Sequence, residues 1–414
     1  MIKRAASRLL NKRTRSAPLG AISLTLIFLF IEFFDELHYA IGNATLPAIR
    51  AELTLSYAQV GLLIGLPHII NTFVEPVLML LGDTSLRKRL VIGGGLAVLV
   101  GLLLTAGATT FPMLLAAYII GFPASVAFVS LSQASLMDAN PGREPKAMAR
   151  WTLAGSLGNL IGPLLVAGGF ALALGWRWVF LVLAVFALGL LLFVSPRKFP
   201  THPNNRIAND RLSLGLLLRN LREAIHAPTL LRWIILLDLS DLLLDVLTSY
   251  TPLYLTDVIG VTPTQTGLLL SLLMLASLAA DALSIPLLER LSGRWLVRIT
   301  AAISIGLYAA FLLSPWPWVR SELLFRIVLL ILIRFSTIGW YSVLQGEAYA
   351  SVPGRSGTVM AINSLSGLLG GGLVWLVGWI AELAGLPAAM WLLLLGPISL
   401  ALFTPRDGKI RGAG

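Results

Sequence analysis

The chain has 414 residues, of which 57% are hydrophobic and only 12% are charged, and its mean hydropathy is +0.85. This composition holds far more apolar side chains than the core of one soluble domain would bury, so we expect most of the chain to lie in lipid. The sequence contains no cysteine, which excludes disulfides, thiolate metal sites and cysteine nucleophiles.

Runs of about 20 mostly apolar residues, the length at which a helix crosses a bilayer, recur along the whole chain. Continuous runs such as LLLSLLMLASLAADALSIPLL (268–288) lack the alternation of a membrane β-barrel. We predict an all-α membrane protein with twelve transmembrane helices in two pseudo-symmetric six-helix bundles. The predicted spans are 18–43, 57–82, 90–109, 111–138, 147–173, 177–195, 230–256, 264–288, 295–314, 321–350, 356–384 and 387–404.

A formal net charge of +11 permits binding to nucleic acid, but the positions of the 31 basic residues indicate a membrane instead. Both tails and every second loop hold 26 of them, and the other loops hold only Arg50, Arg177, Arg320 and Arg326. By the positive-inside rule both termini are cytoplasmic. We therefore predict a multi-pass protein of the cell membrane, in a prokaryote the inner membrane, without a nucleic-acid partner.

The longest polar stretch divides the spans into two sets of six. We predict a basic cytoplasmic tail (1–17), an N-terminal bundle (18–195), a cytoplasmic linker (196–229), a C-terminal bundle (230–404) and a second tail (405–414). A shift of 212 positions aligns PGREPKAMARWTLAGSLGNL (141–160) with PGRSGTVMAINSLSGLLGGG (353–372) without a gap. Parallel repeats of this kind are typical of transporters whose site lies between the two halves.

Charged residues inside the predicted spans indicate such a site. Glu32, Asp35, Glu36 and Tyr39 recur at helical spacing on one face of span 18–43. The repeat-related span 230–256 carries a second acidic face, made of Asp238, Asp241 and Asp245 at i, i+3 and i+7, and we expect the two faces to oppose each other. Each central carboxylate costs roughly 2.5–3.5 kcal/mol on insertion unless it faces water or a partner. We predict a cavity for substrate and protons that is lined by Glu32, Asp35, Glu36, Tyr39, His68, Glu75, Asp238, Asp241, Asp245, Asp281, Arg334, Tyr341 and Glu347.

Nine carboxylates and a single arginine make the predicted cavity acidic. Burial and mutual repulsion disfavour the charged form of such carboxylates, so they can exchange a proton for a cation. Tyr39 and Tyr341 would hold an organic cation through cation–π contact. We predict a proton-coupled secondary transporter, not an enzyme, that acts as a monomer on a cationic small molecule and uses the proton gradient in place of a cofactor.

Two other cargoes fit parts of the pattern. A divalent metal cation would find the oxygen ligands that it prefers on the acidic residues, although no dedicated metal site is predicted. An organic anion or phosphonate would bind through Arg334, which otherwise neutralises a neighbouring acid.

Small residues mark the span 147–173. Gly155, Gly158 and Gly162 share one helix face, and Pro163 permits a bend. The repeat-related span 356–384 has further glycines, among them Gly367 and Gly370. We predict that these residues serve as hinges or packing sites.

The segment AGSLGNLIGPLLVAGG (154–169) resembles the glycine–proline pattern of the drug/proton antiporters of the major facilitator superfamily. GDTSLRKR (82–89) resembles the cytoplasmic gating motif of that superfamily, with Asp83, Arg87 and Lys88 in matching places and Thr84 and Leu86 departing from it. LSYAQVGLL (55–63) and MARWTLAGSLG (148–158) are similar to the fosmidomycin-resistance-like branch. The resemblance implies an exporter that works by alternating access. Its fosmidomycin-resistance-like part favours a phosphonate cargo, whereas the acidic cavity favours organic cations or drug-like amphipathic compounds, and we follow the cavity for the charge of the cargo.

The predicted topology can be tested with a single introduced cysteine, since the native chain has none. Thr201→Cys, in the predicted linker, should react with a membrane-impermeant thiol reagent only from the cytoplasmic side. Labelling of intact cells and of inverted vesicles measures this, and reaction from the outside alone would contradict the topology.

Overall fold

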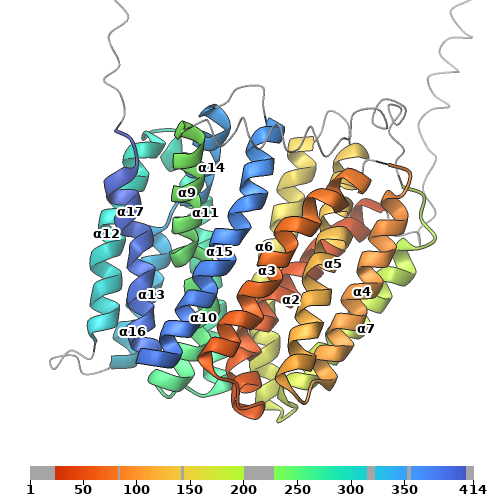
Figure 1. Ribbon diagram of the computed structural model, residues 1–414, viewed down its shortest axis with the longest axis horizontal. Coiled ribbons are helices and arrows are strands. Elements are labelled where there is room, and N and C mark those ends of the chain that lie inside the picture. The colour runs from red at the N-terminus through yellow and green to blue at the C-terminus, as the bar shows by residue number, and fades with distance from the viewer. Residues whose placement is uncertain are drawn as a thin grey trace, which may run out of the picture.

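The computed structural model describes residues 24–82, 84–140, 144–199, 228–314, 322–351 and 356–406. Within these ranges the chain forms helices and no strand, which confirms the predicted all-α fold. The helices stand side by side and run roughly parallel to one another (Figure 1). Asp83 of the gating motif, the tail 1–17 and most of the linker lie outside the described residues.

The N-terminal bundle contains six helices, drawn from red to yellow-green in Figure 1. They are α2 (Leu24–Glu52), α3 (Tyr57–Gly82), α4 (Arg87–Gly107), α5 (Phe111–Asp138), α6 (Glu144–Ala171) and α7 (Gly175–Val194). The first helix differs from the prediction, because it continues nine residues beyond Asn43 to Glu52. Leu46 and Ile49 are buried in the core, so packing continues the helix past Asn43.

The C-terminal bundle has several interrupted helices. One continuous stretch comprises α9 (Pro228–Asp241), the π-helix η2 (Leu242–Val246), α10 (Leu247–Leu253) and the π-helix η3 (Tyr254–Val258). It is followed by α11 (Pro263–Leu288), α12 (Gly293–Leu313), α13 (Glu322–Ser336), α14 (Trp340–Ser351), α15 (Ser356–Ala384), α16 (Leu386–Met390), η4 (Trp391–Leu394) and α17 (Leu395–Phe403). With α13–α14 and α16–α17 each taken as one crossing, the described residues make the twelve predicted crossings.

Ten helical segments among the described residues are long and apolar enough to cross a membrane by length and composition alone. The two crossings that fail this test are α2 and α9–η3. The same two crossings carry the acidic residues that the sequence places on helix faces, so charge and irregular backbone occur where a site between the halves is expected.

Local signals in the sequence set several helix ends. Thr262 and Gln265 form a capping box at the start of α11, and Pro263 occupies its first turn. The Ser292 side chain accepts a hydrogen bond from the Trp295 N–H at the start of α12. Gly385, with a φ of +86°, provides the turn between α15 and α16.

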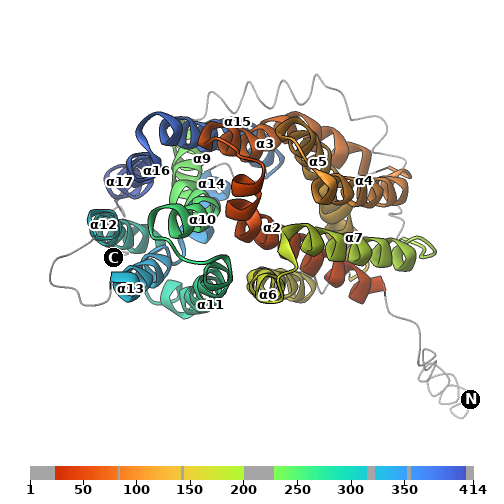
Figure 2. The same cartoon turned by 90° about the horizontal axis from the view of Figure 1, so that it is seen from below.

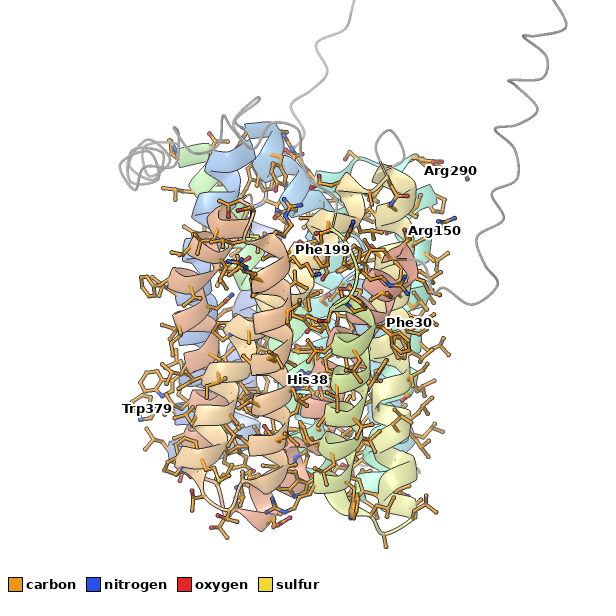
Figure 3. All side chains as sticks on the ribbon, turned by 90° about the vertical axis from the view of Figure 1, so that its right-hand side faces the viewer. Phe30, His38, Arg150, Phe199, Arg290 and Trp379 are labelled. Atoms are coloured by element: carbon orange, nitrogen blue, oxygen red, sulfur yellow. The ribbon has the colours of Figure 1, made fainter. Side chains whose placement is uncertain are left out.

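The two bundles meet along two pairs of helices. Figure 2 shows α3 beside α15 and α6 beside α11, and these are the most extensive contacts between the halves. The α2 helix lies between its own neighbours α5, α6 and α7 and also contacts α10 and α11 of the other bundle. In Figure 3, Arg150 and Arg290 lie near one end of the molecule and His38 lies near mid-height.

The predicted packing glycines of α6 lie directly against α2. A Cβ on Gly158 would collide with the Phe33 carbonyl oxygen and would lie 2.8 Å from the Leu37 nitrogen. One on Gly162 would lie 2.8 Å from the Ala40 Cβ. The two backbones therefore approach as closely as glycine permits.

Gly158→Ala should destabilise the folded protein by about 1–3 kcal/mol, because the new methyl group meets backbone that cannot move without displacing α2. Gly168→Ala is the matched control, since nothing lies within 4 Å of a Cβ there. Thermal unfolding of the detergent-solubilised variants measures both. Equal stability of the two variants would contradict this packing.

Candidate functional site

The acidic face of α2 is held by neutral partners from its own bundle. The Ser125 hydroxyl of α5 donates a hydrogen bond to Asp35. The Asn159 Nδ2 of α6 donates to the Glu36 Oε2 at 2.6 Å. Asp35 and Glu36 are partly accessible, although both lie near the middle of the helix. This face of α2 therefore borders a polar space rather than lipid.

Glu32 lies one turn closer to the start of α2 and is buried, with 8% of its surface exposed. Its Oε1 would lie 2.7 Å from a Cβ on Gly155, so α6 leaves room for this carboxylate only because residue 155 is glycine. Gly155 thus has a second role besides helix packing. It forms the wall against which an intramembrane acid rests.

The facing acids lie where α9 becomes a π-helix. Asp241 is the last residue of α9, and Asp245 lies within η2 with an exposed side chain. In η2 the backbone hydrogen bonds run over five residues, as from the Leu247 N–H to the Leu242 carbonyl. Such wide turns often occur at functional sites because they change the direction of side chains and free carbonyl groups.

A backbone carbonyl of η2 anchors the intramembrane arginine. Arg334 of α13 is 7% exposed; its Nη1 donates to the Leu244 carbonyl at 2.9 Å, and its Nη2 donates to the Thr248 hydroxyl. The guanidinium also lies within electrostatic range of Asp245 and Asp281. Arg334 is therefore hydrogen-bonded to the crossing that carries Asp245, and it lies near two carboxylates without forming a close ion pair with either.

Groups from α3, α14 and α11 complete the site. His68 of α3 lies within electrostatic range of Asp245, and its Nδ1 lies 2.9 Å from the Ile64 carbonyl oxygen. Tyr341 of α14 is 58% exposed and interacts electrostatically with Asp241 and Asp245. A small pocket between the two bundles is lined by Tyr39, Ala40, Asn43, Asn159, Pro163, Thr248, Leu270 and Met274. The geometry thus brings the α2 acids, Asp241, Asp245, Asp281, Arg334, His68 and Tyr341 to one region.

Three other predicted acids have surroundings of their own. Glu347 forms a two-pronged ion pair with Arg294, at 2.6 and 2.7 Å, which joins α14 to α12. Glu75 accepts a hydrogen bond from Asn71 within α3 at 3.0 Å. Asp238 is buried, at 7% exposure, one turn before Asp241, with which it interacts electrostatically. The sequence pattern alone does not distinguish these three acids from those of the central region.

Two further groups of predicted residues have separate surroundings. Arg87 of the gating motif pairs with Asp138 across α4 and α5, while Lys88 lies one position further along α4. Gly367 of α15 lies against Thr72 of α3, whereas Gly370 faces open space, so only Gly367 contributes to packing.

Sequence reasoning missed the polar side chains that hold the acids. Ser125 and Asn159 each lie in a predicted span, and a polar residue inside such a span was the available signal. Thr248 lies one turn after Asp245 on the same face, at i+3, and periodicity would have found it. All three hydrogen-bond an ionisable group of the site.

A protein-family model matches most of this sequence. The model described as Major Facilitator Superfamily matches residues 28–374. The chain belongs to the Major Facilitator Superfamily. It is accordingly a multi-pass membrane transporter of small molecules and not an enzyme.

Solved structures of superfamily members agree in fold. A bacterial homologue of the human lysosomal transporter Spinster, in an inward-facing and occupied conformation, has a TM-score of 0.70 at 17% identity, over 92% of this chain and 94% of that one. The nucleoside transporter NupG has a TM-score of 0.68 at 17% identity, over 92% of this chain and 98% of that one. A D-xylose–proton symporter has a TM-score of 0.69 at 14% identity, over 92% of this chain and 97% of that one. No curated protein matches the sequence.

Glu347→Gln should lower the stability of this superfamily member by about 1 kcal/mol, because a partly exposed charge pair between α12 and α14 is lost. It should leave the binding of a cationic ligand unchanged, since Glu347 is paired with Arg294. Glu289→Gln, an exposed acid at the end of α11, is the control. Thermal unfolding with and without ligand separates the two effects, and a clear loss of affinity would place Glu347 in the cavity.

Proposed function

We propose that this chain is a proton-coupled exporter of organic cations or drug-like amphipathic compounds that works by alternating access. The cargo and the protons share the region between α2 and the α9–η3 crossing. The proton gradient supplies the energy, and the chain acts as a monomer in the cell membrane with both termini in the cytoplasm.

The observation that carries this proposal is the difference between the two acidic faces. On α2, Asp35 and Glu36 are hydrogen-bonded to Ser125 and Asn159, which carry no charge. On the opposite side, Arg334 already interacts with Asp245 and Asp281. The α2 carboxylates therefore gain most from a cationic ligand, because a cation would replace solvent with an opposite charge.

The surroundings of these carboxylates suit an organic cation. Tyr39 lies one turn from Asp35 and Glu36, and Tyr341 lies near Asp241, so aromatic faces are available for cation–π contact. The pocket beside Tyr39 adds Pro163, Leu270 and Met274 as apolar contacts. An amphipathic molecule would place its charge at the α2 acids and its apolar part in this pocket.

Proton coupling follows from competition for the same groups. A carboxylate that holds a proton no longer attracts a cation, so proton binding from one side and cargo binding from the other exclude each other. One structurally similar protein is a D-xylose–proton symporter, so proton coupling occurs on this fold. The direction of export rests on the resemblance of span 154–169 to drug/proton antiporters.

The alternatives have weaker support. Among the described residues, no group of three or more histidine, aspartate or glutamate side chains is arranged to hold a metal ion, which argues against a divalent-metal cargo. An organic anion at Arg334 would lie within electrostatic range of Asp245 and Asp281 and would approach three further carboxylates on α2. The charge balance opposes that cargo.

Asp35→Asn and Glu36→Gln should each weaken the binding of a lipophilic cation such as tetraphenylphosphonium by roughly tenfold, equivalent to about 1.4 kcal/mol. Acidification should weaken binding to the native protein, because protons compete for the carboxylates, and each substitution should flatten that dependence. Equilibrium binding to the purified protein between pH 5.5 and 8.5, roughly the range in which perturbed carboxylates titrate, measures both effects.

Glu52→Gln is the matched control, since Glu52 lies at the far end of the same helix and pairs with Arg177. It should change neither affinity nor pH dependence. If Asp35→Asn and Glu36→Gln also changed neither, the cation proposal would fail, and a phosphonate that binds the native protein but not Arg334→Gln would replace it.

A further inference from the structure

Among the described residues, a cluster of charged and aromatic side chains ties the two bundles together at one end. Arg50, near the end of α2, forms an ion pair with Asp257 of η3 at 2.8 Å. Each side chain is about one quarter exposed, at 25% and 24%. This pair therefore joins the last turn of the first crossing to the last turn of the seventh.

Tyr57 extends the tie to two more helices. Its hydroxyl donates to the Asp257 Oδ2 at 2.9 Å, and its backbone N–H donates to the Glu382 Oε2 of α15 at 2.7 Å. The Arg50 guanidinium lies 3.9 Å from the centre of the Tyr57 ring. We call Arg50, Tyr57, Asp257 and Glu382 the outer quartet, because the positive-inside rule assigns this end of the helices to the outside.

Close backbone contact continues directly beneath the outer quartet. A Cβ on Gly61 would lie 3.0 Å from the Gly378 Cα, and one on Gly371 would lie 2.7 Å from the Gly65 carbonyl oxygen. On the other side of the molecule, a Cβ on Gly267 of α11 would lie 2.6 Å from the Pro163 carbonyl oxygen of α6. Both contacts between the bundles are therefore tight in their outer halves.

The other ion pairs in which both residues are described each lie within one bundle. Arg87–Asp138 and Arg294–Glu347 join neighbouring helices of the N- and C-terminal bundle respectively, and Glu52–Arg177 joins α2 to α7. Among ion pairs for which the structure describes both residues, Arg50–Asp257 alone crosses between the bundles. The described contacts thus hold the outer ends together while the central acids lie at mid-membrane or nearer the other end.

We propose that the outer quartet is the gate that closes the transporter on its outer side. Cargo passes to that side only when Arg50 and Tyr57 separate from Asp257 and Glu382. Each interaction in the outer quartet is partly exposed to water and contributes little alone. A gate of several weak, geometrically matched contacts can close specifically and still open in every transport cycle. The assignment concerns the gate and holds for any cargo.

The test uses Met274→Cys as a single reporter in the otherwise cysteine-free chain. Met274 lines the pocket between the bundles, beneath the proposed gate. A membrane-impermeant thiol reagent is added on the side of the membrane at which Arg50 lies. Adding Asp257→Asn should raise the labelling rate roughly threefold to tenfold, because the loss of one pair shifts the population toward the open state.

Glu52→Gln in the same reporter background is the control, because it breaks a more exposed ion pair at the same end but within one bundle. It should leave the labelling rate unchanged. The exchanged pair Arg50→Asp with Asp257→Arg should restore slow labelling, which a general loosening of the structure would not allow.

Tyr57→Phe provides a second variant that keeps the ring beside Arg50 and removes only the hydrogen bond to Asp257. It should raise the rate by a smaller factor. Unchanged labelling in Asp257→Asn and Tyr57→Phe, or an equal increase in Glu52→Gln, would overturn the proposal. Because the readout involves no cargo, this result is independent of whether organic cations are transported.

Discussion

The cost of placing three carboxylates on one membrane helix is the constraint on which the rest of this structure depends. Lipid offers no partner for Glu32, Asp35 or Glu36, so α2 cannot lie on the periphery of its bundle with this face outward. It lies instead among α5, α6 and α7 and contacts α10 and α11 of the other bundle. The position of α2 therefore determines where the two halves meet, and the site lies on that boundary.

The neighbouring helices are adapted to this position. Gly155, Gly158 and Gly162 bring α6 so close that Asn159, on the same helix, reaches Glu36 at 2.6 Å. A larger residue at 158 would displace the donor together with the backbone. The glycine pattern of α6, which alone indicates only packing, thus also fixes the hydrogen bond that keeps an intramembrane carboxylate in place.

Local patterns predicted the number of crossings, the acidic faces of α2 and α9–η3 and the small-residue face of α6, because each is written in residues a few positions apart. Pairing across the fold could not be predicted in this way. Asn159 and Glu36 are 123 residues apart, and Glu347 and Arg294 are 53 apart. In the sequence Glu347 therefore resembled Asp281. In the structure Glu347 has a close ion-pair partner in α12, whereas Asp281 lies near Arg334. The π-helical turns at 242–246 and 254–258 left no signal, since hydrophobic spacing does not report one extra residue per turn.

The two helices that carry the central acids are also the two that the outer ion pair joins. Glu36 and Arg50 lie on the single helix α2, about 21 Å apart at 1.5 Å per residue, and Asp245 and Asp257 lie on the continuous stretch α9–η3. A cation or proton bound between these helices therefore acts on the same elements whose ends form the outer quartet. Asp245 and Asp257 each lie in a π-helical turn, a rare element that occurs frequently at functional sites. Coupling between cargo and gate then needs no relay of side chains, because a change in the angle between α2 and α9–η3 alters both sites together.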